Sequence, residues 1–394
     1  MLLFHINMKR ASAISVLLLL LTGPSVTTVR ADDRAVSAPM ATDYDRLIDD
    51  GLRALYYLDY SKANEDFREL TDRFPASPLG PYAVATGWWW ELTNEFDERN
   101  PALEKQFLAA ADRAAAFARK SIKTSGDPDG EAHLCLGGAL GLKARWEAIQ
   151  GKWLAAYRDG KQAFDAQEQA IAVNPKMYDA YLGVGIFHYY TATLPAVVKV
   201  LAKLIFGGNK QQGLDEIRAA MDKGRFSRTA ARLFMVGILV NDDKNPSAGL
   251  ALVREGRREY PGSPFFHLLE MLVLDEAKDW DGLEREADDF LTRTKKGEPF
   301  YNPIYEHRAL WSLGNAALGR GDAARAVEIY DGILRDFPLE DRWITMTYLN
   351  RGRAYDRLGE RDKAVADYRA VLKRRNVWGL RDKAKHFLQE ADRP

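Results

Sequence analysis

Histidine and carboxylate side chains build most catalytic and metal sites, and this chain offers no compact set of either. No two histidines are close in sequence, and none has the His-Glu-X-X-His spacing that places two ligands on one helix face. Adjacent carboxylates such as Asp288-Asp289 diverge on a helix, because successive residues lie about 100° apart. A metal site would have to be assembled in space, and no glycosidase-like acid/base pair is indicated. The histidines are His5, His133, His188, His267, His307 and His386.

The sequence signatures of nucleotide binding and nucleophilic catalysis are also absent. No Gly-X-Ser-X-Gly elbow and no dinucleotide fingerprint occurs, and the Gly-rich turn 207–210 follows a predicted helix and not a strand. The lone cysteine, Cys135, lies in an apolar helical stretch and cannot form an internal disulfide. We therefore predict no catalytic residue, no metal and no cofactor. An enzyme of cell-wall or glycan chemistry stays open only as a third hypothesis.

Three consecutive tryptophans, Trp88-Trp89-Trp90, are the most unusual aromatic feature. Three successive helical residues cover roughly 200° of a helix surface. One apolar stripe is narrower than that. This geometry would bring at least one ring toward a groove or solvent, and Trp88 toward the concave side if Gly87 takes the role of Gly51. Burial of all three rings between tightly wound helices is the interpretation that we favour.

Charge argues against a nucleic-acid partner. The chain has 56 basic and 56 acidic residues. No acidic residue lies in the first 31 positions, so a chain starting at Asp32 keeps 53 basic and all 56 acidic residues, a net charge of −3. A nucleic-acid-binding protein normally carries a strong basic patch instead.

Residues 1–31 predict an export signal, with a positive start at Lys9-Arg10 and apolar residues over 11–22. The apolar run is shorter than the ~20 residues that cross a bilayer, so a transmembrane anchor is the weaker alternative. Cleavage after Ala31 would leave a flexible lead at 32–42. We expect the mature protein in the periplasm or cell envelope.

One spacing recurs along the chain and governs its architecture. A Gly is followed 12 residues later by a small residue, 16 later by an aromatic or aliphatic residue, and 24 later by a Pro. Self-similarity at a period in the thirties indicates stacked helical hairpins. The copies are Gly51, Ala63, Phe67 and Pro75; Gly237, Gly249, Val253 and Pro261; Gly314, Ala326, Tyr330 and Pro338; and Gly352, Ala364 and Tyr368, with Asn376 in place of Pro.

The spacing has a physical reason. The Gly and the small residue sit where the two helices of a hairpin touch, and the residue 16 after the Gly fills the groove toward the next hairpin. The Pro ends the second helix. These residues resemble the tetratricopeptide repeat (TPR) motif, most strongly over 307–374, and the resemblance implies a right-handed superhelix.

The predicted fold is an all-α solenoid of roughly eight or nine such hairpins. We expect an N-terminal half at 43–225, with an irregular apolar hairpin at 177–223, and a C-terminal half at 226–394. A helix at 377–392 is expected to cap the last hairpin, because a solenoid end otherwise exposes an apolar face.

The central segment 183–214 departs from the plain motif. It is similar to a stretch of the eukaryotic tetratricopeptide-repeat-39 family through Gly183, Phe187, Leu194-Pro195, Lys199, Gly207-Gly208 and Gly213-Leu214. Its helix 195–206 is apolar almost all round, with Lys199 and Lys203 on one stripe. This pattern favours a buried helix whose lysines reach solvent, with a membrane-surface helix as the alternative.

We predict a non-enzymatic scaffold that binds a protein or peptide partner in the concave groove of the solenoid. The alternative is a peripheral membrane or lipid-handling protein that uses helix 195–206. Groove recognition usually combines aromatic anchors with polar groups. The expected groove residues lie around the marker glycines on first helices: Trp88, Phe234, Ile238, Trp311, Asn315, Leu349 and Arg353, with Arg308 and Asp356 near the rim.

Overall fold

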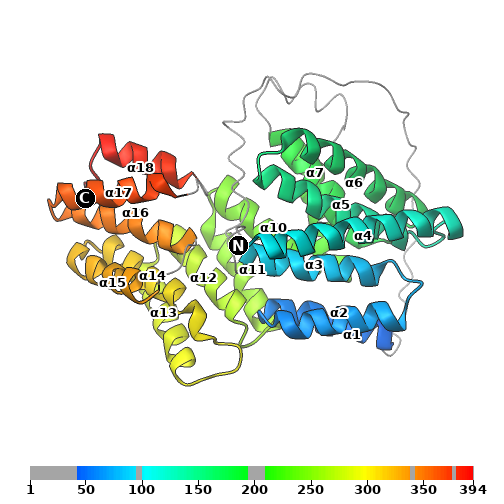
Figure 1. Ribbon diagram of the computed structural model, residues 1–394, viewed down its shortest axis with the longest axis horizontal. Coiled ribbons are helices and arrows are strands. Elements are labelled where there is room, and N and C mark those ends of the chain that lie inside the picture. Colours follow the sequence, from blue (N-terminus) through cyan, green and yellow to red (C-terminus); the bar gives the residue numbers. More distant parts are fainter. Residues whose placement is uncertain (1–41, 95–99, 194–208, 338–341, 375–378, 394) are drawn as a thin grey trace.

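The computed structural model describes residues 42–94, 100–193, 209–337, 342–374 and 379–393. Within these ranges lie 17 α-helices and no strand. Successive helices pair into hairpins and stack in chain order (Figure 1). The predicted all-α solenoid is therefore confirmed. The expected export signal 1–31 and the apolar segment 195–206 lie outside the described residues.

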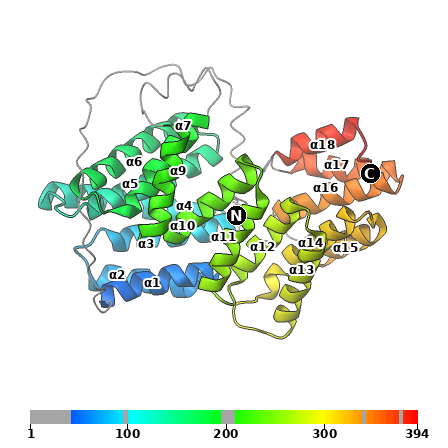
Figure 2. The same cartoon turned by 180° about the vertical axis from the view of Figure 1, so that it is seen from behind.

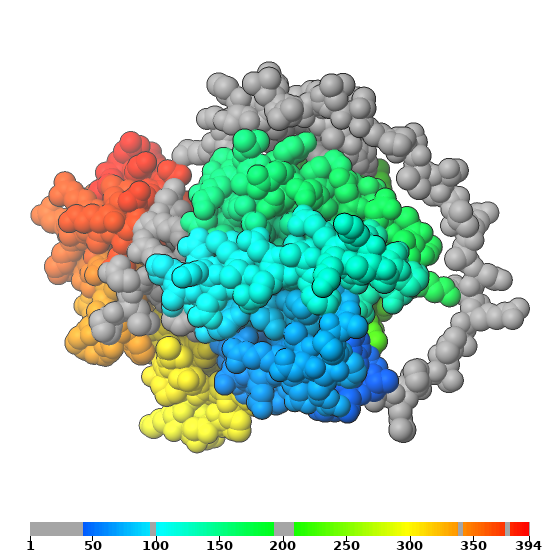
Figure 3. All heavy atoms as spheres, turned by 45° about the vertical axis from the view of Figure 1, so that its right-hand side comes forward, coloured from blue at the N-terminus to red at the C-terminus, as the bar shows by residue number. Residues whose placement is uncertain are grey.

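Eight pairs of helices and a terminal helix make up the described solenoid. The first four pairs are α1 (Asp43–Tyr56) with α2 (Tyr60–Arg73), α3 (Leu79–Asn94) with α4 (Pro101–Ser125), α5 (Glu131–Ile149) with α6 (Trp153–Val173), and α7 (Tyr178–Thr193) with α9 (Lys210–Lys223). Figure 3 shows these helices as successive bands of one face, from blue through cyan to green.

The second half continues the same pattern, with α10–α12 between the two ends of the molecule (Figures 1 and 2). The pairs are α10 (Arg228–Gly237) with α11 (Pro246–Glu259), α12 (Pro264–Ala277) with α13 (Trp280–Lys295), α14 (Glu306–Gly319) with α15 (Ala323–Asp336), and α16 (Arg342–Arg357) with α17 (Arg361–Lys373). Helix α10 continues as a short π-helix, Ile238–Asp242, and α18 (Leu380–Gln389) forms the predicted cap.

Short polar residues start the second helices of several hairpins. The carboxylates of Asp59, Asp279 and Asp322 each accept a hydrogen bond from the backbone N–H three residues on, at 2.9 to 3.1 Å. Such caps satisfy donors that the first helical turn leaves unpaired. At the other end, α2 and α11 stop two residues before Pro75 and Pro261, as the repeat pattern predicts.

In the copies where the residue 16 after the marker glycine is aromatic, its ring is a wedge between hairpins. The Phe67 ring is fully buried against Gly51 of its own hairpin and Gly87 of the next. A Cβ atom at Gly51 would overlap the ring. The predicted groove-filling role of this position is confirmed here.

The same wedge recurs at the C-terminal end. Tyr330 is packed on Gly314, and Tyr368 on Gly352, both without exposed surface. Tyr368 also stacks on Phe387 of the cap α18, with ring centroids 5.6 Å apart. The cap thus takes the place of a further first helix.

One junction inverts the arrangement. Here the glycine, Gly256, is on the second helix α11, and the ring is Phe266 on the following first helix α12. Phe266 is fully buried and stacks on Tyr260 at 5.4 Å. The two helices still touch closely, but the glycine now lies on the second helix and the aromatic ring on the following first helix.

The solenoid winds tightly enough for its beginning to touch its middle. The Tyr56 ring of α1 packs on Tyr260 at 5.0 Å, and Trp90 of α3 packs on Phe265 at 5.2 Å. The hydroxyl of Ser263 donates to the Tyr56 carbonyl at 2.5 Å. We call this contact the closure. It places α1 and α3 against α12, about 200 residues later in the chain.

No helix among the described ranges has both the length and the apolar character needed to cross a membrane.

Changing Gly314 to Ala is expected to destabilise the protein by about 1–3 kcal/mol, because the new methyl group overlaps the buried Tyr330 ring. Thermal unfolding followed by circular dichroism measures the loss. Gly332→Ala is the matched control, since its Cβ would meet nothing nearer than 3.9 Å. That control should keep or raise the melting temperature, because Ala favours helix over Gly by about 1 kcal/mol. Equal melting temperatures for the two variants would contradict the claim that the Tyr330 ring fills the space beside Gly314.

Candidate functional site

A polar chain of side chains links three consecutive first helices. Asn315 of α14 donates from Nδ2 to Asp275 Oδ1 of α12 at 3.0 Å, and its Oδ1 accepts from Asn350 Nδ2 of α16 at 2.8 Å. Arg353 reaches Asn350 Oδ1 at 3.4 Å. We call Asp275, Asn315, Asn350 and Arg353 the inner ladder. Tyr330 fixes its centre by donating to Asn315 Oδ1 at 2.6 Å.

Asp275 is the part of the ladder with spare hydrogen-bonding capacity. Burial raises the pKa of its carboxyl from 3.8 to about 6, and the hydrogen bond from Asn315 opposes that shift. Its side chain remains partly accessible. Among the hydrogen bonds of the described residues, only Oδ1 is engaged. The second carboxylate oxygen is thus an available acceptor.

The C-terminal tail binds the other end of the ladder. The Asp392 carboxylate lies 3.4 Å from Arg353 Nε and accepts from Arg357 Nε at 2.8 Å. The backbone N–H of Asp392 donates to Asp356 Oδ2 at 3.0 Å. Asp356 also accepts from Arg361 and Tyr368, so its carboxylate is fully used inside the chain.

The predicted rim residue Arg308 is buried at the closure. Its Nη2 donates to the Asn94 carbonyl at the end of α3 at 2.8 Å, and its guanidinium stacks over Tyr305 at 4.8 Å. Arg342 donates to the Thr93 carbonyl next to it. Two cations therefore satisfy carbonyls that the C-terminus of α3 leaves unpaired within the helix.

Most of the predicted groove residues are covered in this chain. Ile238, Trp311 and Leu349 are buried, with 1%, 5% and 4% of their surface exposed. Trp311 packs edge-on against Trp343 at 5.3 Å. The closure and the tight winding fill space that an open superhelix would leave to solvent.

Two of the predicted groove residues lie outside the C-terminal repeats: Trp88 on α3 in the N-terminal half, and Phe234 on α10 just after it. Trp88 is half-buried, whereas Trp89 and Trp90 are buried, so the favoured burial of all three rings does not hold for Trp88. Phe234 is half-buried, and the Arg145 guanidinium lies over both Phe234 and Trp89 at 5.7 and 5.1 Å. These side chains are not part of the inner ladder.

Two segments match models of the tetratricopeptide repeat, residues 308–339 and 347–376. They carry Asn315, Asn350 and Arg353 of the inner ladder. The sequence matches no curated protein.

The chain is also similar to several solved structures. A tetratricopeptide repeat protein from Parabacteroides merdae is 10% identical, covering 88% of this chain and 99% of that one, with a TM-score of 0.35. Yeast Tom70 is 11% identical, covering 88% of this chain and 81% of that one, with a TM-score of 0.43. The human IFIT1 dimer with PPP-AAAA is 13% identical, covering 88% of this chain and 84% of that one, with a TM-score of 0.46.

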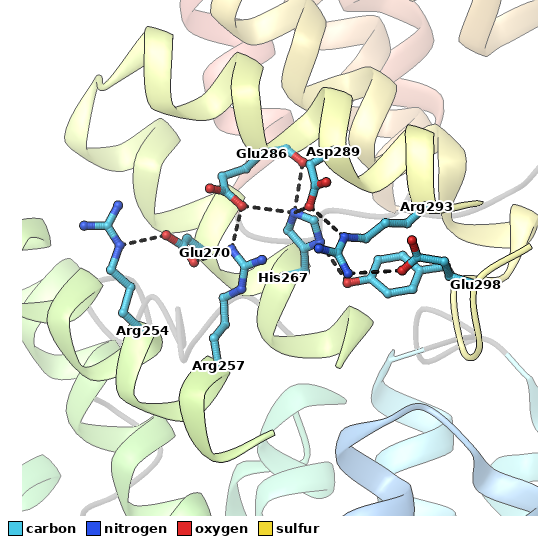
Figure 4. Close-up of polar contacts among 9 residues, drawn as sticks. Arg254, Arg257, His267, Glu270, Glu286, Asp289, Arg293 and Glu298 are labelled. Carbon is cyan, nitrogen blue, oxygen red and sulfur yellow. Dashed lines mark hydrogen bonds and ion pairs between the residues drawn. The ribbon is translucent and has the colours of Figure 1, made fainter. Parts of the chain in front are cut away.

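A second polar cluster joins α11, α12 and α13 (Figure 4). The buried His267 places Nε2 at 2.9 Å from the Glu286 backbone oxygen and 3.2 Å from Glu286 Oε2. Because a carbonyl only accepts, Nε2 carries the proton. Arg257 donates to both Glu270 and Glu286, at 2.7 and 2.5 Å. Asp289 pairs with Arg293 at 2.7 Å.

His267, Glu286 and Asp289 are close enough to share a cation, but each already has a partner. The spacing from His267 Nε2 to the two carboxylates is 3.2 and 4.0 Å. A metal would have to remove the Nε2 proton and displace Arg257 and Arg293 from the carboxylates. The cluster is better explained as an ionic clamp between helices. Sequence reasoning missed it because its members lie on three helices.

The ladder residues Asp275 and Asn350 were also missed. A signal for them exists in the repeat period, since the hydrogen-bonded pairs Asp275–Asn315 and Asn315–Asn350 are 40 and 35 residues apart. Positions that recur at the repeat length lie at similar heights on neighbouring first helices.

The ionic clamp predicts an acid-sensitive contribution to stability. The hydrogen bond from His267, helped by Arg257, lowers the pKa of Glu286 from 4.5 to about 2. Its stabilisation is therefore present above pH 4.5 and is lost as pH falls toward 2. We expect Glu286→Gln to lower the unfolding free energy by about 2 kcal/mol at pH 7, and the gap to close by pH 2.

Thermal melts of both proteins across this pH range measure the gap. Glu328→Gln, at an exposed position on α15, is the control for the loss of one charge. A gap between wild type and Glu286→Gln that stays constant from pH 7 to pH 2 would refute the clamp.

Proposed function

We propose that this chain is a non-enzymatic scaffold that binds a protein or peptide partner along the inner ladder. The observation that carries the proposal is the continuous polar path from Asp275 through Asn315 and Asn350 to Arg353, placed on consecutive first helices. Two of these helices belong to matched tetratricopeptide repeats. Repeats of this type commonly serve protein interaction, and stacked repeats offer an extended binding surface.

Asn315 and Asn350 are buried and bonded within the ladder, so Asp275 is the ladder group that can meet an extended peptide. Asp275 Oδ2 offers an acceptor for a backbone N–H or a basic side chain. Trp311, one helical turn before Asn315, is buried and takes no part in this contact. The backbone N–H groups of an extended peptide are donors that such an acceptor can bind.

The aspartate is the best place to test this proposal. Asp275→Asn keeps the shape and can still hydrogen-bond Asn315, but it removes the charge. We expect partner affinity to fall about tenfold, because a hydrogen bond to a charged group contributes about 1.5–3 kcal/mol. Asp288→Asn, the same change at an exposed position on α13, is the matched control.

Cross-linked capture from the native compartment identifies the partner, and titration of a synthetic partner peptide measures the affinity. Wild-type affinity should also weaken as pH falls below about 6, where the Asp275 carboxylate becomes protonated. Asp275→Asn should lack this pH dependence. Equal affinities for the Asp275 and Asp288 variants would show that the partner does not bind at Asp275. Failure to find any peptide partner would contradict the scaffold proposal.

We further propose that the protein works in the periplasm or cell envelope. The support is the sequence of residues 1–31, with its positive start and short apolar run. Sequencing the N-terminus of the protein recovered by osmotic shock should give Asp32 as the first residue. An uncleaved chain found only in the cytosolic fraction would contradict export.

A further inference from the structure

We propose that the segment after α18, residues 390–393, is an internal ligand at the end of the inner ladder, and that an acidic residue of the partner displaces it. We call this segment the tail. Its Asp392 carboxylate lies on Arg353, the last ladder residue, and on Arg357 one turn further along α16. The acidic character of the partner rests on the proposed scaffold function, whereas the contact between the tail and the arginines does not.

Two arginines share the single carboxylate of Asp392. Arg357 Nε donates to Asp392 Oδ2 at 2.8 Å, and Arg353 Nε lies 3.4 Å from the same oxygen. Within the described ranges neither arginine has another ion pair. Asp356, whose carboxylate also faces the tail, is ion-paired with Arg361. Two guanidinium groups therefore have one carboxylate between them, and a carboxylate is the anion that their geometry suits.

The tail fills this site incompletely. Arg353 Nε is buried but makes no hydrogen bond in the part of the chain that the structure describes. Only one of the two Nε–H groups therefore bonds to the Asp392 carboxylate. A carboxylate that bonded to both would gain a charge-assisted hydrogen bond that the tail does not make. A better-placed acidic residue can thus replace the internal ligand.

The contact distinguishes the two acidic residues of the tail. The Asp392 side chain is 13% exposed, whereas the Glu390 side chain is 78% exposed. The backbone takes part as well, because the Asp392 N–H donates to Asp356 Oδ2 at 3.0 Å. Unspecific attraction between an acidic segment and a basic surface would not separate two carboxylates that lie two residues apart. The tail is therefore bound at one position, as a ligand is.

The tail can leave without taking the cap helix with it. Helix α18 packs along α17 and α16 (Figure 1). Arg361 Nη2 donates to the carbonyls of Phe387 and Leu388 at the end of α18, both at 2.8 Å. From residue 391 on, the hydrogen bonds and ion pairs among the described residues are those of Asp392 alone. Release of the tail costs only these few contacts.

Release of the tail would add a cationic site to the accessible end of the ladder. Burial raises the pKa of Asp275, and the hydrogen bond from Asn315 together with the positive charges of Arg353 and Lys383 opposes that shift. Lys383 belongs to α18, so the cap helix and the arginines lie within electrostatic reach of Asp275. A partner that donates to Asp275 thus finds a place for an acidic residue nearby once the tail has left.

Labelling of a cysteine placed in the tail measures how often the tail is released. The full chain with Ala391→Cys is treated with a maleimide, and the native Cys135 is buried and adds little background. In this parent, Asp392→Asn should raise the labelling rate about tenfold, because the tail loses its hydrogen bond between charged groups. Glu390→Gln removes the same charge from an exposed position and should label like the parent.

An acidic peptide tests whether the site accepts a ligand from outside. The probe is acetylated and amidated hexaglutamate, and hexaglutamine is its uncharged control. Hexaglutamate should raise the labelling rate of the parent, and hexaglutamine should not. Arg357→Gln should remove this response to the peptide. Arg335→Gln, the same change at a side chain that is 72% exposed, should keep it. Circular dichroism checks that each variant keeps its helix content.

Two results would overturn the proposal. Equal labelling rates for Asp392→Asn and Glu390→Gln would show that Asp392 does not hold the tail. A parent labelling rate that hexaglutamate leaves unchanged would show that the arginines take no acidic ligand and that the tail is a fixed part of the cap. If hexaglutamate releases the tail but the capture experiment finds no partner, the scaffold proposal fails and the carboxylate site at the two arginines stands.

Discussion

The wedge of an aromatic ring on a bare glycine backbone is the contact on which the whole solenoid depends. Phe67, Tyr330 and Tyr368 each occupy space that a single added methyl group would claim. A close-packed interior has no slack for that methyl group. Because each wedge touches two hairpins, it sets both the packing within a repeat and the step to the next one. The cap helix α18 is held by the same device, through Tyr368 and Phe387.

Repetition of this step brings the chain back on itself. The closure buries Tyr56 and Trp90 against helices far along the sequence, and it draws Arg308 away from the solvent-facing role expected of it. Only a small part of the inner surface of the solenoid therefore stays accessible to a partner. Its accessible part is the end of the ladder at Asp275, whose second carboxylate oxygen accepts no hydrogen bond from the described residues.

The repeat spacing predicted the hairpins, their boundaries and the wedges, because these are contacts between near neighbours in the sequence. It did not predict the closure, since small rotations per repeat add up to a winding that no single repeat encodes. This winding explains why Ile238, Leu349 and Asn315 are buried, with Asn315 joined to Arg353 only through Asn350. The ionic clamp around His267 had no local signature, because its members come from three helices.

The closure also changes how such a chain should fold. A linear array of repeats has almost only local contacts, so it can nucleate anywhere and lose terminal repeats one at a time. Hydrogen bonds such as those of Ser263 with Tyr56 and Arg308 with Asn94 span 207 and 214 residues. Contacts of that range raise the contact order and slow folding. They also tie the first hairpin to the middle of the array, so the molecule should melt as one cooperative unit and not fray from its N-terminus.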